Sequence, residues 1–436
     1  MRHQLLMVAS LCIGLLLGGA IGSTAEPVRY FGESDEHPLN RLWNGVLTDF
    51  APELLSESLT NIRALQHGEP HTELLGRLDA ILSDPKLITD LRPLERLLLQ
   101  QRLWRVFDLL ASEIRSEWYT SHPTYEHEVR DVGRGSLEAN RAVRARLASL
   151  IHLTVLTESE VDQLPSNYSA QSLNRPDEPI SALHDLTLPP DLFDEDSEWM
   201  QVIYKSVRRI GLAHEGVRGQ RSEALLFVRF PEGKEQGLKF IEQFNAHEHW
   251  QYMQTVPVKR RPKKPEFDYP TVPDGMQLIL LSRLLAILPN GEVAPTSVIE
   301  SIEFNVGERA FDRQSRFRQN AVMKHAAFKV SMEHLLSEEE QTLERIAPGE
   351  QFLGAQLTQV NGCIGCHQKT NDVLAFGTSA FSRFAPQPDD LSLRVVPNGT
   401  SPLTAVAKMN SFDFGLLRGF LDQQVETSEP APEIQD

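Results

Sequence analysis

The stretch PLERLLLQQRLWRVFDLLASEI, residues 93–114, decides the fold class that the sequence predicts. Its apolar residues recur every three or four positions, which is the spacing of one face of an α-helix. Pro93 stands where proline is favoured, in the first turn of a helix, so we expect the helix to begin there. The same spacing recurs from about residue 38 to 160, and we therefore predict a helical region over 26–163.

The pattern changes after this helical region. Residues 164–200 are rich in proline, serine and acidic residues, which is typical of an exposed loop. The run ALLFVRF at 224–230 then has the apolar content of a strand and ends at Pro-Glu-Gly. The segment GLKFIEQFNAHEHW, which follows, returns to helical spacing.

The part of the chain up to residue 345 is also predicted to hold a pair of strands and another helix. Asn290-Gly291 lies between two apolar runs, which indicates a hairpin. Residues from about 310 to 345 have helical spacing. We therefore predict a small mixed α/β region over 201–345, within a protein that is mainly α.

The N-terminal residues 1–25 have the pattern of a cleavable signal peptide. A basic start at Arg2 and His3 precedes a short apolar run and small residues that end at Ala25. The apolar run is shorter than the roughly 20 residues that cross a bilayer, and we expect no integral membrane segment after signal removal. The sequence thus predicts a protein that is periplasmic or otherwise exported.

The overall charge limits the partners that the protein is expected to have. The formal net charge is −17 at neutral pH, with 60 acidic and 43 basic residues. A polyanion such as nucleic acid would be repelled at long range, so we expect no nucleic-acid partner. A hydrophobic content of 41% is ordinary for a globular protein, and burial of apolar surface can hold the fold together.

The short stretch GCIGCH, residues 362–367, carries the chemistry. It holds two of the three cysteines, Cys363 and Cys366, since Cys12 lies in the predicted signal peptide. Cys-x-x-Cys-His is the spacing of covalent haem attachment, in which both thiols bind the porphyrin and His367 becomes an axial iron ligand. A thioredoxin-like redox pair would give His367 no role. A structural zinc site would need four ligands, more than this motif supplies. A plain disulfide remains the alternative.

The last 80 or so residues resemble a monohaem class I cytochrome c domain. The resemblance is carried by GAQL at 354–357 leading into NGCIGCH, by Met409, and by the later run DFGLLRGFLDQQ. It implies an all-α cytochrome c fold over 346–425, with a disordered tail at 426–436. It also implies that the helix containing Gly354 crosses Phe420 of the last helix.

The resemblance further implies that Met409 is the second axial ligand of the iron. His325, His334 and Lys408 are the other candidates, and a vacant position is a further possibility. We expect one covalently bound haem c, and a protein that transfers single electrons to or from a redox partner protein. The alternatives are a haem enzyme or gas or peroxide sensor with an open sixth iron position, and a binding protein with an accessory haem domain.

Two other motifs are expected to have no chemical role. His247-Glu248-His249 lacks a third metal ligand nearby, so we expect a surface or packing role. The triplets that begin at Asn167 and Asn398 match glycosylation acceptors, but such triplets arise often by chance, and the second is better explained as a turn and helix start.

Overall fold

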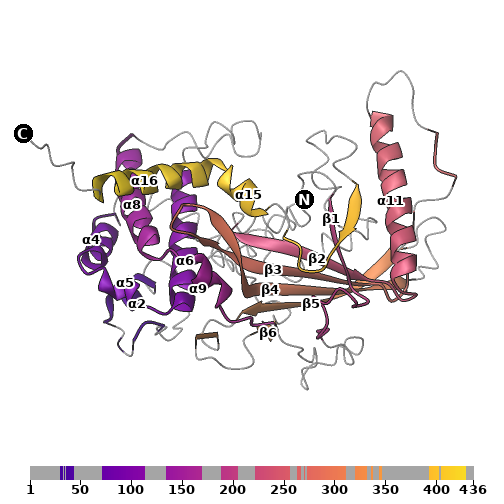
Figure 1. The fold of residues 1–436 in the computed structure, drawn as a ribbon. Coiled ribbons are helices and arrows are strands. Elements are labelled where there is room, and N and C mark those ends of the chain that lie inside the picture. Colours follow the sequence, from indigo (N-terminus) through magenta and orange to yellow (C-terminus); the bar gives the residue numbers. More distant parts are fainter. Residues whose placement is uncertain are drawn as a thin grey trace, which may run out of the picture.

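The computed structural model describes the chain in separate stretches. They are residues 30–43 apart from 33 and 35, 71–112, 134–168, 188–204, 221–255, 263–266, 270, 273–310, 320–330, 335–336, 343–345, 392–401 and 404–428. Within these stretches, helices from both ends of the chain gather at one end of an antiparallel sheet (Figure 1). A long helix, α11 (Lys234–Thr255), stands at the other end.

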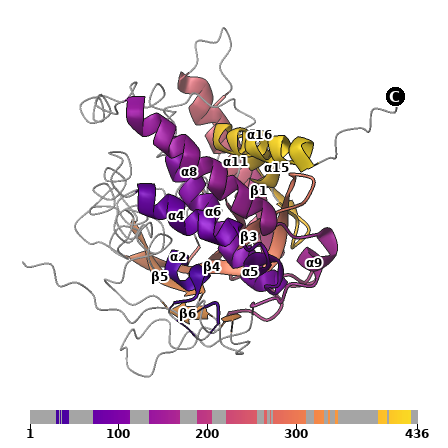
Figure 2. The same cartoon turned by 90° about the vertical axis from the view of Figure 1, so that its left-hand side faces the viewer.

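The helical layer is built from both terminal parts of the sequence. The N-terminal part supplies α2 (Pro38–Leu42), α4 (His71–Leu82), α5 (Lys86–Thr89), α6 (Pro93–Ser112), α8 (Arg134–Leu153) and α9 (Glu158–Asp162). The C-terminal part adds α15 (Thr404–Met409) and α16 (Phe412–Ser428). In the view of Figure 2, α4, α6, α8 and α16 lie in front of the sheet.

Helix α6 is the centre of this layer, and it begins at Pro93 as predicted. Its aromatic residues Trp104 and Phe107 are fully buried in a core shared with α4, α8 and α16. The ring centroids of Trp104 and Phe414 are 5.6 Å apart. The rings of Phe107 and Phe420 make an edge-to-face contact, with centroids 6.1 Å apart. Burial of side chains of this size contributes about 1.5–3 kcal/mol each. The C-terminal helix is therefore held by the N-terminal helices.

The sheet has seven strands in the order β6-β5-β4-β3-β2-β1-β7. Every neighbouring pair is antiparallel. The strands are β1 (Met200–Tyr204), β2 (Ser222–Arg229), β3 (Gln277–Ile287), β4 (Val293–Ala310), β5 (Asn320–Val330), β6 (Leu343–Arg345) and β7 (Leu393–Val396).

The central strands β2 and β3 are buried on both faces, which explains their nearly continuous apolar sequences. One face, with Phe227 and Leu281, packs against residues of α6, α9 and the segment before β1. The opposite face, with Leu226 and Leu280, packs against Phe240, Ile241 and Phe244 of α11. The strand at 224–230 and the helix after it are thus confirmed as β2 and α11.

The predicted hairpin is confirmed between β3 and β4. Gly291 has φ +73°, a left-handed conformation that glycine adopts without strain. The turn is closed by the Leu288 N–H, which donates to the Glu292 carbonyl at 2.8 Å. Asn290 also accepts the N–H of Glu292 through its side chain. An Asn-Gly pair provides this geometry from local sequence alone.

The predicted fold class, mainly α with a small mixed region, is wrong. The stretch from 310 to 345, expected to be helical, contains β5 and β6. Residues 320–329 of β5 pair with 301–310 of β4 along their whole length. The β5 sequence NAVMKHAAFKV is rich in alanine and lysine, which favour helix in isolation, but pairing with a neighbouring strand overrides such local preference.

The predicted C-terminal all-α cytochrome c fold is also wrong. Strand β7 lies within that part and pairs with β1, with Val395 opposite Val202. Helices α15 and α16 belong to the helical layer, and Phe420 contacts Phe107 of α6. Its expected crossing partner, Gly354, lies outside the described residues.

The segment predicted as an exposed loop, 164–200, contributes to the core at its described ends. Leu188, Leu192 and Trp199 are all buried against the sheet. Tyr168 donates its hydroxyl to the Pro189 carbonyl at 2.6 Å, and burial raises its pKa, with the negative charge of Asp191 adding to the rise. This hydrogen bond joins the two described ends of the segment.

Gly237 sets how closely α11 can approach the sheet. A Cβ at this position would lie 2.1 Å from Met200 Cε and 2.6 Å from Phe230 Cδ2. We expect Gly237→Ala to destabilise the protein, because overpacking costs about 1–3 kcal/mol and exceeds the gain of about 0.5–1 kcal/mol in helix propensity. Urea denaturation measures the change.

The matched control for this prediction is Gly419→Ala. Gly419 also lies inside a helix, but a Cβ there would meet nothing within 4 Å. This variant should be slightly more stable than the wild type. Equal effects of the two substitutions would contradict the close contact at Gly237.

Candidate functional site

The residues predicted to bind haem are divided between the described and the remaining parts of the chain. Cys363, Cys366 and His367 lie outside the described residues. In the sequence they fall between β6 and β7, which form opposite edges of the sheet. Met409 is the last residue of α15 and is partly buried against the helical core. The structure therefore does not place these four residues relative to one another.

The other candidate iron ligands have different surroundings. His325 lies on strand β5, where it pairs with Asn305, and not on a helix as expected. His334 is outside the described residues. Lys408 is 1% exposed and is part of a buried ion cluster.

The buried ion cluster joins three parts of the fold at one carboxylate oxygen. Asp108 Oδ2 on α6 accepts from Lys408 Nζ at 2.7 Å and from Arg221 Nη1 at 2.8 Å. The Lys408 ammonium also lies 5.1 Å from the centre of the Trp104 ring, within cation–π range. The cluster therefore ties α15 and the start of β2 to the central helix.

The pKa of Lys408 is lowered, with burial as the largest cause. Desolvation lowers the pKa of its ammonium, the negative charge and hydrogen bond of Asp108 oppose this, and the positive charge of Arg221 adds to the lowering. Asp413 gives a further favourable interaction. A buried charge of this kind depends on its partner, because its own desolvation costs several kcal/mol.

A second polar group is centred on Glu223 of β2, two residues after Arg221. The Glu223 side chain is fully buried and accepts hydrogen bonds from Arg283 of β3 and from the Ser401 hydroxyl just before α15. Burial raises the pKa of Glu223, and the Arg283 charge and the two hydrogen bonds oppose the rise. Lys408 and Ser401 together anchor the segment that leads into and through α15.

Asn398 fixes the chain between β7 and α15. Its side-chain amide donates to the carbonyls of Leu192, Asp194 and Trp199, each at 3.0 Å. Its side-chain oxygen accepts the Gln201 N–H at 2.9 Å. The turn predicted here is present, since Gly399 has φ +85°. An amide with these bonds is part of the structure and not a free glycosylation acceptor.

The other acceptor triplet is engaged in the same way. Asn167 is 7% exposed, and its side chain bonds the backbone of Ile299 in both directions. The Ile299 N–H donates to Asn167 Oδ1 at 2.6 Å, and Asn167 Nδ2 donates to the Ile299 carbonyl at 2.9 Å. The side chains of Asn167 and Asn398 therefore hold separate backbone segments together through hydrogen bonds.

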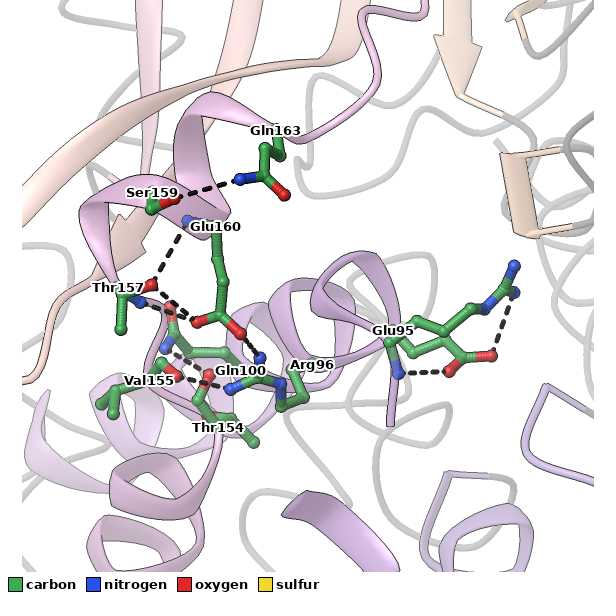
Figure 3. A network of polar contacts seen from close by, with 10 residues as sticks. Glu95, Arg96, Gln100, Thr154, Val155, Thr157, Ser159, Glu160 and Gln163 are labelled. Carbon is green, nitrogen blue, oxygen red and sulfur yellow. Dashed lines mark hydrogen bonds and ion pairs between the residues drawn. The ribbon is translucent and has the colours of Figure 1, made fainter. Parts of the chain in front are cut away.

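A polar network joins α6 to α9 and to the residues just before α9 (Figure 3). Gln100 extends it to the end of β3. Gln100 is fully buried, donates to the Thr154 carbonyl at 3.2 Å and accepts the Ile287 N–H at 2.8 Å. Arg96 donates to the Val155 carbonyl at 2.9 Å and pairs with Glu160. Thr157 and Glu160 form a capping box at the start of α9.

This network was not predicted, although its capping box has a sequence signal. Thr-x-x-Glu before an apolar residue is the signature of such a cap. Burial alone would raise the pKa of Glu160. The net shift is downward, because the carboxylate accepts hydrogen bonds from the Thr157 backbone, from Arg96 and from the Thr157 hydroxyl, and because Arg96 is positively charged.

The lowered pKa of Glu160 predicts how stability changes with pH. A carboxyl whose pKa is lower in the folded state stabilises the fold above its unfolded pKa, about 4.5, and this stabilisation is lost as the pH falls through the folded pKa. Glu160→Gln should therefore be less stable than the wild type at pH 7, and the difference should shrink toward pH 3.

Urea denaturation at several pH values measures this difference. Glu158→Gln, at an exposed position in the same first turn, is the control for the effect of charge near the helix N-terminus. If the two variants show the same pH dependence, the contacts of Glu160 with Thr157 and Arg96 do not explain it.

The two histidines of the HEH motif lie on α11 and differ in exposure. His247 is 3% exposed and meets Trp250 edge-on, with ring centres 6.3 Å apart. His249 is exposed. Across the described residues, no group of three or more His, Cys, Asp or Glu side chains is placed to hold a metal ion.

Comparisons with known proteins find no relative of this chain. No protein-family model, curated protein or solved structure matches the sequence. None of the helices in the described stretches has the length and apolar content needed to span a bilayer.

Proposed function

We propose that the protein is an exported c-type cytochrome that transfers single electrons to or from a partner protein. One haem would be attached through Cys363 and Cys366, with His367 as an axial ligand of its iron. The observation that carries the proposal is Cys-x-x-Cys-His in a chain whose first 25 residues have the pattern of a signal peptide. When bound, the haem supplies one-electron chemistry.

The donor set fits this group. Two thiols and an imidazole within five successive residues are the side chains that covalent haem attachment requires. The segment that carries them, 346–391, begins directly after β6 and ends just before β7. Both flanking strands are paired in the sheet, at its opposite edges.

We further propose Met409 as the second axial ligand. Lys408, one of the other candidates, already donates its ammonium to Asp108, whereas the Met409 thioether has no competing ionic partner to release. Its partly buried position at the end of α15 is compatible with a role at the edge of the helical layer.

Visible spectroscopy tests this role of Met409. Met409→Ala should abolish the sulfur-to-iron absorption band of the oxidised protein and open the iron to cyanide or carbon monoxide. Met253→Ala on α11 is the matched control and should leave the spectrum unchanged. A wild-type protein that already binds these ligands readily would favour the second candidate, a haem enzyme or sensor.

The proposed function is tested by the stability of the colour on unfolding. The mature protein, produced in a host that matures c-type cytochromes, should keep its haem absorbance through denaturation and gel filtration in guanidinium chloride. Haem that separates from the unfolded chain would contradict covalent attachment, because only thioether bonds survive loss of the fold.

A further inference from the structure

The side-chain amide of Asn245 binds both backbone groups of one residue at the edge of the sheet. β7 is the last strand in the sheet order, and among the described strands only β1 pairs with it. From α11, Asn245 Nδ2 donates to the Leu393 carbonyl at 2.8 Å, and Asn245 Oδ1 accepts the Leu393 N–H at 2.7 Å. Two residues that face each other in an antiparallel pair exchange the same two bonds. Asn245 therefore makes the bonds that a residue of a further strand would make.

The same arrangement occurs at two other places where a strand extends past its neighbour. Ile287 lies beyond the part of β3 that pairs with β2, and Gln100 binds its N–H at 2.8 Å and its carbonyl at 3.3 Å. Ile299 lies before the part of β4 that pairs with β5, and Asn167 binds its N–H at 2.6 Å and its carbonyl at 2.9 Å. Side-chain amides thus occupy several positions of the sheet where a neighbouring strand is missing.

The outer edge of β7 holds more than the one residue that Asn245 binds. Backbone groups alternate in direction along a strand, so residues two apart point to the same side. Since Leu393 directs its groups to Asn245, Val395 directs its own to the same outer side. The strand sequence LRVV includes two β-branched residues, which favour extended structure. An unsealed edge of this kind is a template for another strand.

The packing of α11 holds Asn245 in place. Phe240, Ile241 and Phe244 of the same helix are buried against the sheet, in a core that also contains Leu393. Asn245 itself is only half-buried. Replacing its side chain should therefore remove the two bonds to β7 while the helix stays anchored by its apolar residues.

We propose that Asn245 seals the outer edge of β7, and that the opened edge pairs with β7 of a second copy of the chain. A strand can pair antiparallel with its own copy about a twofold axis, so that one strand supplies both sides of the contact. Leu393 of one copy would exchange bonds with Val395 of the other. This seal does not depend on the proposed haem.

Sedimentation velocity of the full chain over a range of concentrations tests the seal. Asn245→Ala removes both bonds, so its mass should rise with concentration to about twice that of the wild type. Asn245→Asp also loses the donor to the Leu393 carbonyl, but it keeps an acceptor for the N–H and places a charge at the edge. Because charged side chains keep edge strands unpaired, this variant should retain the wild-type mass.

A second substitution tests whether β7 itself makes the contact. Val395→Pro removes the outward N–H without removing a bond to β1, a position at which an edge strand tolerates proline. Added to Asn245→Ala, it should restore the wild-type mass. If the proline variant fails to fold, the comparison of Asn245→Ala with Asn245→Asp still decides the result.

Asn40→Ala is the matched control for loss of the same pair of bonds. Asn40 binds the N–H and the carbonyl of Phe31, each at 2.9 Å, and Phe31 belongs to no strand. This variant should lose stability without a change in mass. An Asn245→Ala protein that keeps the wild-type mass overturns the inference. Association that is equally strong in Asn40→Ala, or that a folded Val395→Pro variant does not reverse, also overturns it.

Discussion

Asp108→Ala should strongly destabilise the protein. It removes the carboxylate that accepts from both Lys408 and Arg221, whose side chains are 1% and 11% exposed. The two buried cations would then repel each other without the carboxylate that bridges them, although Asp413 still acts favourably on Lys408. Loss of one partner of a buried ion pair costs about 3–5 kcal/mol, a large part of the stability of an ordinary domain.

Chemical denaturation measures this loss against two further variants. Asp79→Ala removes an exposed pair with Arg146 and should cost less than about 1 kcal/mol. The combined variant Asp108→Leu, Arg221→Met and Lys408→Met should regain most of the lost stability, because it removes all three charges together. A loss at Asp108 no larger than that at Asp79 would show that the cluster is not desolvated.

The second large effect is expected at the two cysteines. The variant with Cys363→Ala and Cys366→Ala should lose all haem that resists denaturation, because no thiol of the proposed attachment site remains. Each single variant should retain a less stable attachment through one thioether bond. Cys12→Ala is the matched control, since Cys12 lies in the predicted signal peptide and should have no effect on the haem of the mature chain.

A haem-stained denaturing gel and the absorbance of the unfolded protein measure this prediction. The reading as a plain disulfide makes the opposite prediction, in which wild type and double variant are equally colourless. Colour that persists in the unfolded double variant would show that the haem is attached elsewhere.

The elements that could be predicted from the sequence depend on neighbouring residues. The start of α6 at Pro93, strand β2 and the Asn290-Gly291 turn each follow from signals within a few positions. The capping box at Thr157 and Glu160 also has a local signal, because the Thr-x-x-Glu pattern indicates it.

The remaining features depend on contacts between distant residues. Strand β7 is only four residues long and pairs with β1, almost 200 positions earlier, so no local pattern indicates its partner. Lys408 and Asp108 are 300 positions apart. The one local hint was an acidic residue within the apolar run VFDLL of α6, which requires a buried partner of opposite charge.

The resemblance to a cytochrome c domain predicted local chemistry but not packing. A haem attachment motif occupies five residues and can occur in different folds, since function lies in a site and not in a fold. Of the helices after the motif, α16 packs against α6 and α8, and α15 lies against β2, β4 and α16. The motif therefore supports the proposed cofactor, while the cytochrome c fold does not follow from it.

Intact mass analysis of the mature chain tests the central claim most directly. The chain should be produced with its signal peptide in a host that matures c-type cytochromes, then unfolded and freed of non-covalent ligands. We predict a mass equal to the polypeptide from about residue 26 plus one haem. A mass equal to the polypeptide alone, with or without one disulfide, would contradict the proposed cytochrome.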